Sequence, residues 1–146
     1  MELFELLWNP WSSHLLISAG LGVSIGVERE LAGKDPGIRT FTLISLGSCL
    51  FTMLSVSSAM GIPNAEPSRI AAQIIPGIGF LGAGAIFRSH QRVGGLTTAA
   101  LMWVTAAIGM AVGFDQLALA VQATFITVAL VLLLNGVRKV LHKLAE

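Results

Sequence analysis

Apolar residues fill five long stretches of the chain, and short segments rich in charged residues, glycine or proline separate them. The stretches are Pro10–Val27, Phe41–Met60, Ile70–Phe87, Leu96–Val112 and Leu117–Leu134. A helix of about 20 residues crosses a hydrocarbon core of about 30 Å, and each stretch approaches that length. We therefore predict an all-α membrane protein, a bundle of five transmembrane helices within residues 1–136.

The third stretch combines an almost wholly apolar character with Pro76 and four glycines. In a soluble helix an interior glycine costs about 1 kcal/mol and a proline about 3 kcal/mol. A membrane helix tolerates both, because neighbouring helices and lipid prevent it from unravelling. We predict that this helix is kinked at Pro76 and packs centrally.

Glycine pairs spaced by four residues in the first and fourth stretches have the pattern of close helix contacts. The alternative is that glycine is simply tolerated in lipid. The glycines that we expect at helix contacts are Gly22, Gly26, Gly77, Gly79, Gly82, Gly84, Gly109 and Gly113.

Hydroxyl side chains recur every three or four residues along the second stretch, so they share one helix face. In lipid, such groups bond to the backbone or to a neighbouring helix. The alternative is that they line a polar pathway. The residues are Thr42, Ser45, Ser48, Thr52 and Ser55.

Composition supports membrane insertion, since 54% of the 146 residues are hydrophobic and only 12% are charged, against about 25% in soluble domains. Five spans place Arg69 on one side of the membrane and the other eight Lys and Arg residues on the opposite side. The positive-inside rule then predicts a multi-pass protein of the inner (cytoplasmic) membrane, with its N-terminus outside and its C-terminus cytoplasmic. Residues 137–146 read as a short basic amphipathic tail on the cytoplasmic membrane surface.

Charged residues gather at the predicted helix ends on the cytoplasmic side. They are either interfacial anchors or a polar cluster at the cytoplasmic mouth of the bundle. Because unpaired acids near hydrocarbon are costly, we expect Glu28 to pair across helices with Arg39 or Arg88. The candidate cluster is Glu28, Arg29, Glu30, Arg39, Thr40 and Arg88.

A weakly bound, hydrated Mg²⁺ is conceivable beside oxygen ligands, with Glu28, Glu30 and Asp35 as weak candidates. No other cofactor is expected, since the three histidines lie far apart in sequence. No nucleophile–base pattern or phosphate-binding loop appears, so the sequence predicts no enzyme. No nucleic-acid partner is expected.

Four motifs in order resemble the MgtC/SapB family of bacterial inner-membrane proteins. They are GVERE at 26–30, GIRT at 37–40, RIAAQIIPGIGFLGAGAIF at 69–87 and GLTTAALMWVTAAIGMAVG at 95–113. The resemblance implies adaptation to low magnesium, virulence through survival inside host cells and, for some members, restraint of the membrane ATP synthase. Members commonly carry a soluble C-terminal domain, which we expect to be absent because the sequence stops at Glu146.

Glycine-faced helices without strong charge inside the membrane favour a non-enzymatic regulatory protein that works through helix–helix contacts. Its expected partners are the lipid bilayer, further copies of itself in a homo-oligomer, and another membrane protein such as ATP synthase. The alternative is a transporter or channel for magnesium or another cation. A transporter would place acidic groups near the middle of the membrane, whereas these acids lie at helix ends and in loops.

Overall fold

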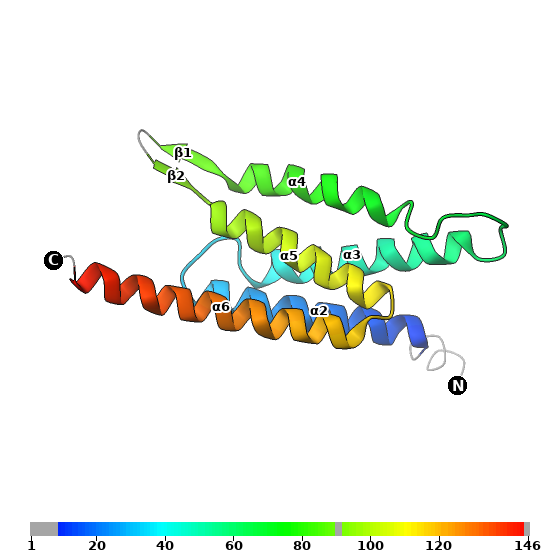
Figure 1. The fold of residues 1–146 in the computed structure, drawn as a ribbon, viewed down its shortest axis with the longest axis horizontal. Helices are drawn as coiled ribbons and strands as arrows, with labels where there is room; N and C mark the ends of the chain where they lie inside the picture. Colours follow the sequence, from blue (N-terminus) through cyan, green and yellow to red (C-terminus); the bar gives the residue numbers. More distant parts are fainter. Residues whose placement is uncertain (1–8, 90–91, 145–146) are drawn as a thin grey trace.

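The computed structural model describes residues 9–89 and 92–144, and this part of the chain forms an up-and-down bundle (Figure 1). Successive helices run antiparallel, so the predicted five-helix fold is confirmed. The helices are α2 (Pro10–Leu31), α3 (Ile38–Ala59), α4 (Ile74–Ala85), α5 (Leu96–Gly113) and α6 (Leu117–Leu144).

The bundle has two chemically different ends. The 32–37 loop, residues 86–89 and 92–95, and the C-terminal end of α6 lie together at one end, which we call the basic end (Figure 1). The 60–70 and 114–116 loops and the start of α2 lie at the other, which we call the distal end. Asn9 begins α2 with a capping box, because its Oδ1 accepts the Ser12 N–H at 3.0 Å while Ser12 Oγ accepts the Asn9 N–H at 3.1 Å.

Helix α3 packs between α2 and α5 through glycines. A side chain at Gly22 would meet the Phe41 carbonyl oxygen at 2.8 Å, and one at Gly26 would meet the Ile38 Cα at 2.5 Å. On the other side of α3, a side chain at Gly109 would overlap the Ser45 backbone. Gly113 likewise lies against α3. The backbones therefore approach more closely than any larger residue would allow.

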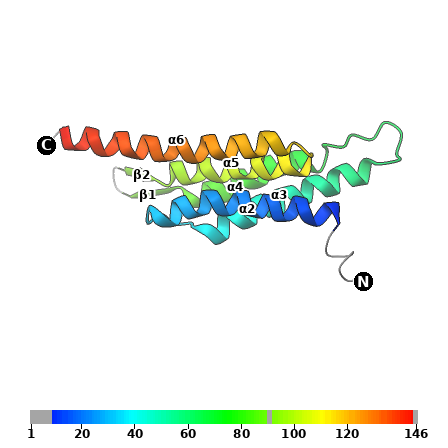
Figure 2. The same cartoon turned by 90° about the horizontal axis from the view of Figure 1, so that it is seen from below.

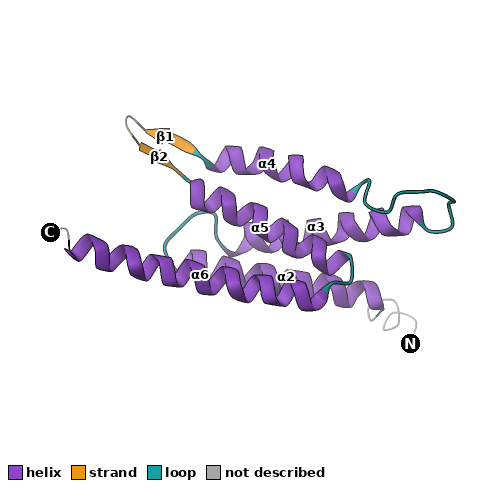
Figure 3. Ribbon diagram, in the orientation of Figure 1, coloured by secondary structure: helices purple, strands orange, loops and turns teal. Residues whose placement is uncertain are grey.

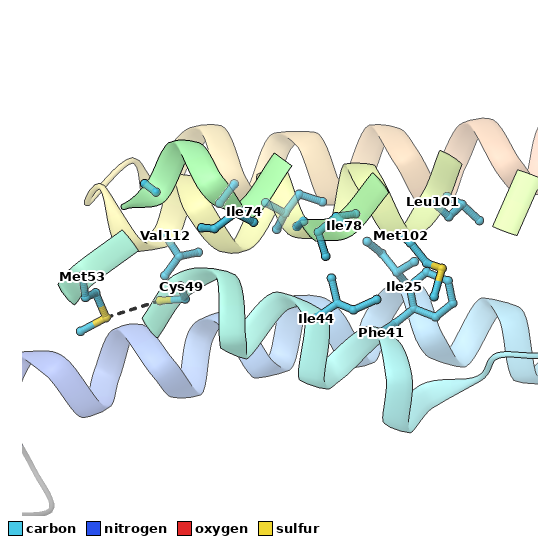
Figure 4. Close-up of a cluster of buried hydrophobic side chains, with 14 residues drawn as sticks. Ile25, Phe41, Ile44, Cys49, Met53, Ile74, Ile78, Leu101, Met102 and Val112 are labelled. Carbon is cyan, nitrogen blue, oxygen red and sulfur yellow. Dashed lines mark hydrogen bonds between the residues drawn. The ribbon is translucent and has the colours of Figure 1, made fainter. Parts of the chain in front are cut away.

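Buried apolar side chains fill the spaces between these glycine contacts. Ile25 of α2, Phe41 of α3 and Met102 of α5 lie together near the basic end (Figure 4). Cys49 and Val112 continue the cluster toward the distal end. The core thus extends along the whole length of the bundle.

The hydroxyl face of α3 is used for packing. Ser18 Oγ donates to the Ser45 carbonyl oxygen at 2.8 Å and lies 2.9 Å from Ser45 Oγ. Thr52 Oγ1 donates to the Ser48 carbonyl oxygen four residues back, at 2.8 Å. These bonds satisfy the hydroxyls within the bundle, where an unpaired polar group is costly.

Ser55 fixes the long distal loop to the end of α3. Its Oγ accepts the N–H groups of Ile70 and Ala71 at 3.0 and 3.1 Å and donates to the Pro67 carbonyl oxygen at 2.8 Å. One hydroxyl group therefore fixes the backbone of the segment that leads into α4.

Helix α4 differs from its neighbours in length and packing. A short 3-10 turn, η1 (Ala71–Gln73), precedes it, and Pro76 lies in its first turn. There the missing proline N–H costs little, since first-turn N–H groups lack helical partners. The structure thus records a change from 3-10 to α-helix just before Pro76, and the kink at Pro76 stays a prediction.

Among the residues that the structure describes, three helical segments are long and apolar enough to cross a membrane by length and composition: α3, α5 and Leu117–Arg138 of α6. Helix α4 with its 3-10 turn is apolar but shorter, Ala71–Ala85. It packs on α5, where a side chain at Gly82 would meet the Ala99 Cβ at an ordinary 3.5 Å. A side chain at Gly77, Gly79 or Gly84 would meet nothing within 4 Å, so these three do not form the helix contacts expected of them within this chain.

A two-stranded hairpin, which the sequence pattern did not predict, connects α4 to α5 (Figure 3). Strand β1 (Phe87–Ser89) pairs antiparallel with β2 (Arg92–Gly94). The Phe87 ring lies over Gly94, where a side chain would overlap it. Gly95 then begins α5 with φ +84°, a conformation that favours glycine.

Helix α6 continues without a break to Leu144 and projects beyond the rest of the bundle at the basic end (Figure 2). The tail predicted at residues 137–146 is therefore, as far as the structure describes it, the last part of α6. It does not form a separate helix on the membrane surface. The reason is that Arg, Lys and Leu are good helix formers and no proline interrupts them.

Candidate functional site

The last turn of α2 holds a buried ion pair at the basic end. The side chains of Glu28 and Arg29 are 6% and 4% exposed. Arg29 Nε donates to Glu28 Oε2 at 2.5 Å, and Arg29 Nη2 donates to Glu28 Oε1 at 2.6 Å. This two-pronged geometry is the strong form of an arginine–carboxylate pair. Because adjacent helical residues do not normally face each other, both side chains must fold back toward one another.

Asn135 of α6 joins this pair from the far end of the sequence. Its Nδ2 donates to Glu28 Oε1 at 3.4 Å, a long contact across 107 positions. Asn135 was not among the residues predicted from the sequence. The signal that could have indicated it is its position directly after a long apolar stretch, where an amide can bond to a neighbouring helix. The pair therefore ties the end of α2 to α6.

The predicted pairing of Glu28 with Arg39 or Arg88 is wrong. Both arginines are exposed, and the ion pairs among the described residues are Glu28–Arg29 and His14–Asp115. Arg29 belongs to the same helical turn as Glu28, so pairing requires no distant element to be ordered. Arg39 lies in the first turn of α3 and Arg88 in the segment after α4, and both are exposed. Long cationic side chains commonly keep their charged groups in water in this way.

Several of the other predicted residues line a polar cavity of about 820 Å³ at the basic end. Glu30, Asp35, Arg39 and Thr40 line it, together with residues of the 36–38 segment, Ala85 and Phe87. The cavity lies between the start of α3 and the end of α4. The structure thus separates the predicted cluster into a buried pair and a cavity lining, with Arg88 in neither.

Glu30 has a definite structural role at this cavity. Its Oε2 accepts the Ile38 N–H at 3.2 Å, at the start of α3, where Gly37 supplies no side-chain cap. A carboxylate at a helix N-terminus is also favoured by the helix dipole. A side chain at Gly37 would displace the Glu30 carboxylate from this position, so glycine leaves room for the contact with Ile38.

The three metal candidates do not converge. Glu28 is bound to Arg29 inside the bundle, whereas Glu30 and Asp35 line the polar cavity. Within residues 9–89 and 92–144, no group of three His, Cys, Asp or Glu side chains could hold an ion. Two carboxylates supply few of the oxygen ligands that Mg²⁺ takes, so an ion at the polar cavity would keep several of its waters.

A second polar contact closes the distal end. His14 Nε2 of α2 lies 3.0 Å from Asp115 Oδ1, in the turn between α5 and α6. Asp115 is exposed and has φ +61°. Helix α2 is thus linked to α6 itself at the basic end, through Asn135, and to the turn that precedes α6 at the distal end, through Asp115.

The sequence model of the MgtC family matches residues 15–140, which include the buried pair, Asn135 and the whole polar cavity. The chain belongs to the MgtC family. It is 42% identical over 119 residues to "Putative magnesium transporter YhiD" of Escherichia coli K12, covering 78% of this chain and 55% of that protein. It is 39% identical over 140 residues to "Protein MgtC" of Salmonella typhimurium LT2, covering 96% of this chain and 59% of that protein.

This MgtC-family chain therefore spans little more than half the length of those two curated relatives. No solved structure matches it. The match to the family model and the three apolar helices together show that the chain is a membrane protein. Its relatives include a protein named as a putative magnesium transporter.

Proposed function

We propose that this chain is a non-enzymatic regulatory protein of the bacterial inner membrane, acting in magnesium adaptation through helix–helix contacts. The observation that carries the proposal is the closed interior of α2, α3 and α5. Glycine contacts bring their backbones together, and buried hydroxyls such as Ser18 and Thr105 bond to carbonyl oxygens. An interior of this kind favours a fixed scaffold over a hydrated path.

The outer surface offers the contacts that such a regulator needs. The outer face of α4 carries Phe80, which is 80% exposed, beside the open glycines Gly79 and Gly84. Small residues allow a second helix to approach closely in lipid. We infer that a second copy of the chain, forming a homo-oligomer, or a partner membrane protein packs on this face.

A transporter or channel for magnesium or another cation is the second candidate. The name of the YhiD relative favours it, as do the two carboxylates, Glu30 and Asp35, that line the polar cavity. Both carboxylates lie at the basic end, however, and not along the middle of a helix.

Ion flux in proteoliposomes separates the two candidates. The purified chain is reconstituted with a magnesium-sensitive dye inside, and an inward Mg²⁺ gradient is applied. We expect uptake equal to that of protein-free liposomes. Saturable uptake that the Glu30→Gln and Asp35→Asn variants abolish, but Arg88→Gln does not, would establish the transporter instead.

ATP synthase is the partner suggested by the family resemblance. The test is ATP-driven proton pumping in inverted inner-membrane vesicles made with and without the chain. We expect slower pumping with the chain present and unchanged ATP hydrolysis by the soluble head of the synthase. Equal pumping rates, at matched amounts of synthase, would remove this partner from the proposal.

A further inference from the structure

An apolar cavity of about 570 Å³ lies between α3 and α4. Its walls include Leu43, Gly47 and Phe51 of α3 and Gly77 and Leu81 of α4. Ile44 and Ile78 point toward one another across its base (Figure 4). The lining is almost wholly apolar, so an apolar occupant fits it.

The apolar cavity adjoins the polar cavity. Thr40 lines both, and on α4 the apolar wall reaches Leu81 while the polar wall begins at Ala85, one helical turn later. The two cavities are therefore neighbours, and the polar one lies at the basic end. We call them together the α3–α4 groove, with the polar cavity as its mouth.

The depth of the apolar part matches one leaflet of a bilayer. Thr40 and Phe51 bound it along α3, eleven residues apart, which is about 17 Å at 1.5 Å per residue. Half of a hydrocarbon core is about 15 Å. An acyl chain of the leaflet at the basic end would therefore run along the groove for its full depth.

The mouth carries charges of both signs. Arg39 is exposed and has no ion-pair partner among the described residues. Glu30 is held in place by the Ile38 N–H, and Asp35 lines the same cavity. A guanidinium is complementary to a phosphate, and carboxylates are complementary to an ammonium group.

We propose that the α3–α4 groove is a binding site for a phospholipid whose headgroup carries both a phosphate and a primary ammonium, as phosphatidylethanolamine does. Arg39 binds the phosphate, Glu30 and Asp35 bind the ammonium, and an acyl chain lies between Gly47 and Gly77. The site is independent of whether the chain is a regulator or a transporter.

Native mass spectrometry of the full chain in detergent tests this proposal. The chain is offered dioleoyl phosphatidylethanolamine, phosphatidylglycerol or phosphatidylcholine at equal concentrations. We expect preferential retention of phosphatidylethanolamine. Arg39→Gln should weaken its binding about tenfold, as loss of one charge-assisted hydrogen bond does, and Glu30→Gln with Asp35→Asn should remove the preference over phosphatidylglycerol.

Blocking the apolar part provides a separate test. A Cβ added at Gly47 would meet nothing within 4 Å, and Gly47 lines the groove, so the longer side chain of Gly47→Leu would enter it. Gly20→Leu on α2 is the matched control, since it is equally open and does not line the groove. We expect Gly47→Leu to lose lipid retention and Gly20→Leu to keep it, with similar melting temperatures.

Three results would overturn the proposal. The first is equal retention of all three lipids, and the second is a preference for phosphatidylglycerol. The third is a change of oligomeric state in Gly47→Leu without loss of lipid, which would assign the groove to a helix of another copy.

Discussion

Glu28 and Arg29 carry opposite charges at a site from which water is almost completely excluded. Moving charges into such a site is costly, and the two-pronged bond with the Asn135 contact compensates for it only while both partners are present. The pair lies where α2 ends and α6 passes, so it couples the position of the two helices. Removing one partner leaves a buried, uncompensated charge.

We therefore expect Glu28→Gln to lower the free energy of unfolding by about 3–5 kcal/mol, because Arg29 is then unpaired. The double variant Glu28→Gln with Arg29→Gln should recover part of this loss, since no buried charge remains. The measurement is thermal or detergent-induced unfolding of the purified chain.

Glu30→Gln is the matched control, since Glu30 is exposed and its amide replacement can still accept the Ile38 N–H. Its effect should stay within about 0.5 kcal/mol. If Glu28→Gln were no more destabilising than this control, the pair would not hold α2 in place.

At the scale of whole elements, glycine serves opposite purposes in α5 and α4. Gly109 and Gly113 allow α5 to rest on the backbone of α3. Gly79 and Gly84 of α4 meet nothing within 4 Å inside the chain. The same residue type therefore marks an internal contact in one helix and an open outer face in the other.

This difference predicts opposite signs for the same substitution. Gly109→Ala should destabilise the chain by about 1–3 kcal/mol, because the added methyl group overlaps the Ser45 backbone. Gly84→Ala should leave stability unchanged or raise it by up to about 1 kcal/mol, since alanine favours the helix and nothing obstructs it. Unfolding curves of the two variants in the same detergent give the comparison.

A loss of stability in Gly84→Ala would show that the outer face of α4 is packed in the purified protein. The proposed contact between copies would then be its explanation. Cross-linking between two copies of the chain through the outer face of α4, measured on the same sample, would show whether that contact is present.

The whole molecule has a strongly uneven charge distribution along its axis. The hairpin, the 32–37 loop and the end of α6 gather basic residues at one end, and Arg69 stands alone at the other. Basic segments are retained in the cytoplasm during insertion. We accordingly predict that the basic end, the buried ion pair and the mouth of the α3–α4 groove lie on the cytoplasmic side.

Cysteine labelling of intact cells checks this orientation. In a Cys49→Ser background, Asn64→Cys in the distal loop should react with a membrane-impermeant thiol reagent added outside. Lys34→Cys at the basic end should react only after the cells are opened. The opposite pattern would invert the molecule and exclude the cytoplasmic assignment.

The sequence by itself determined the five helices, with the first beginning at Pro10, and the charge asymmetry, because these depend on local composition and on apolar run lengths. It also located the polar residues of the basic end. The β1–β2 hairpin escaped prediction, since three-residue strands are too short to show a period.

Only the tertiary structure decided which groups meet. Glu28 pairs with its neighbour Arg29 and contacts Asn135, 107 positions away. Glycines form close contacts in α5, whereas three of those in α4 are open positions. The physical reason is that the facing of each helix depends on packing between distant segments. A one-dimensional pattern shows which residues can make a close contact, whereas the packed bundle selects their partners.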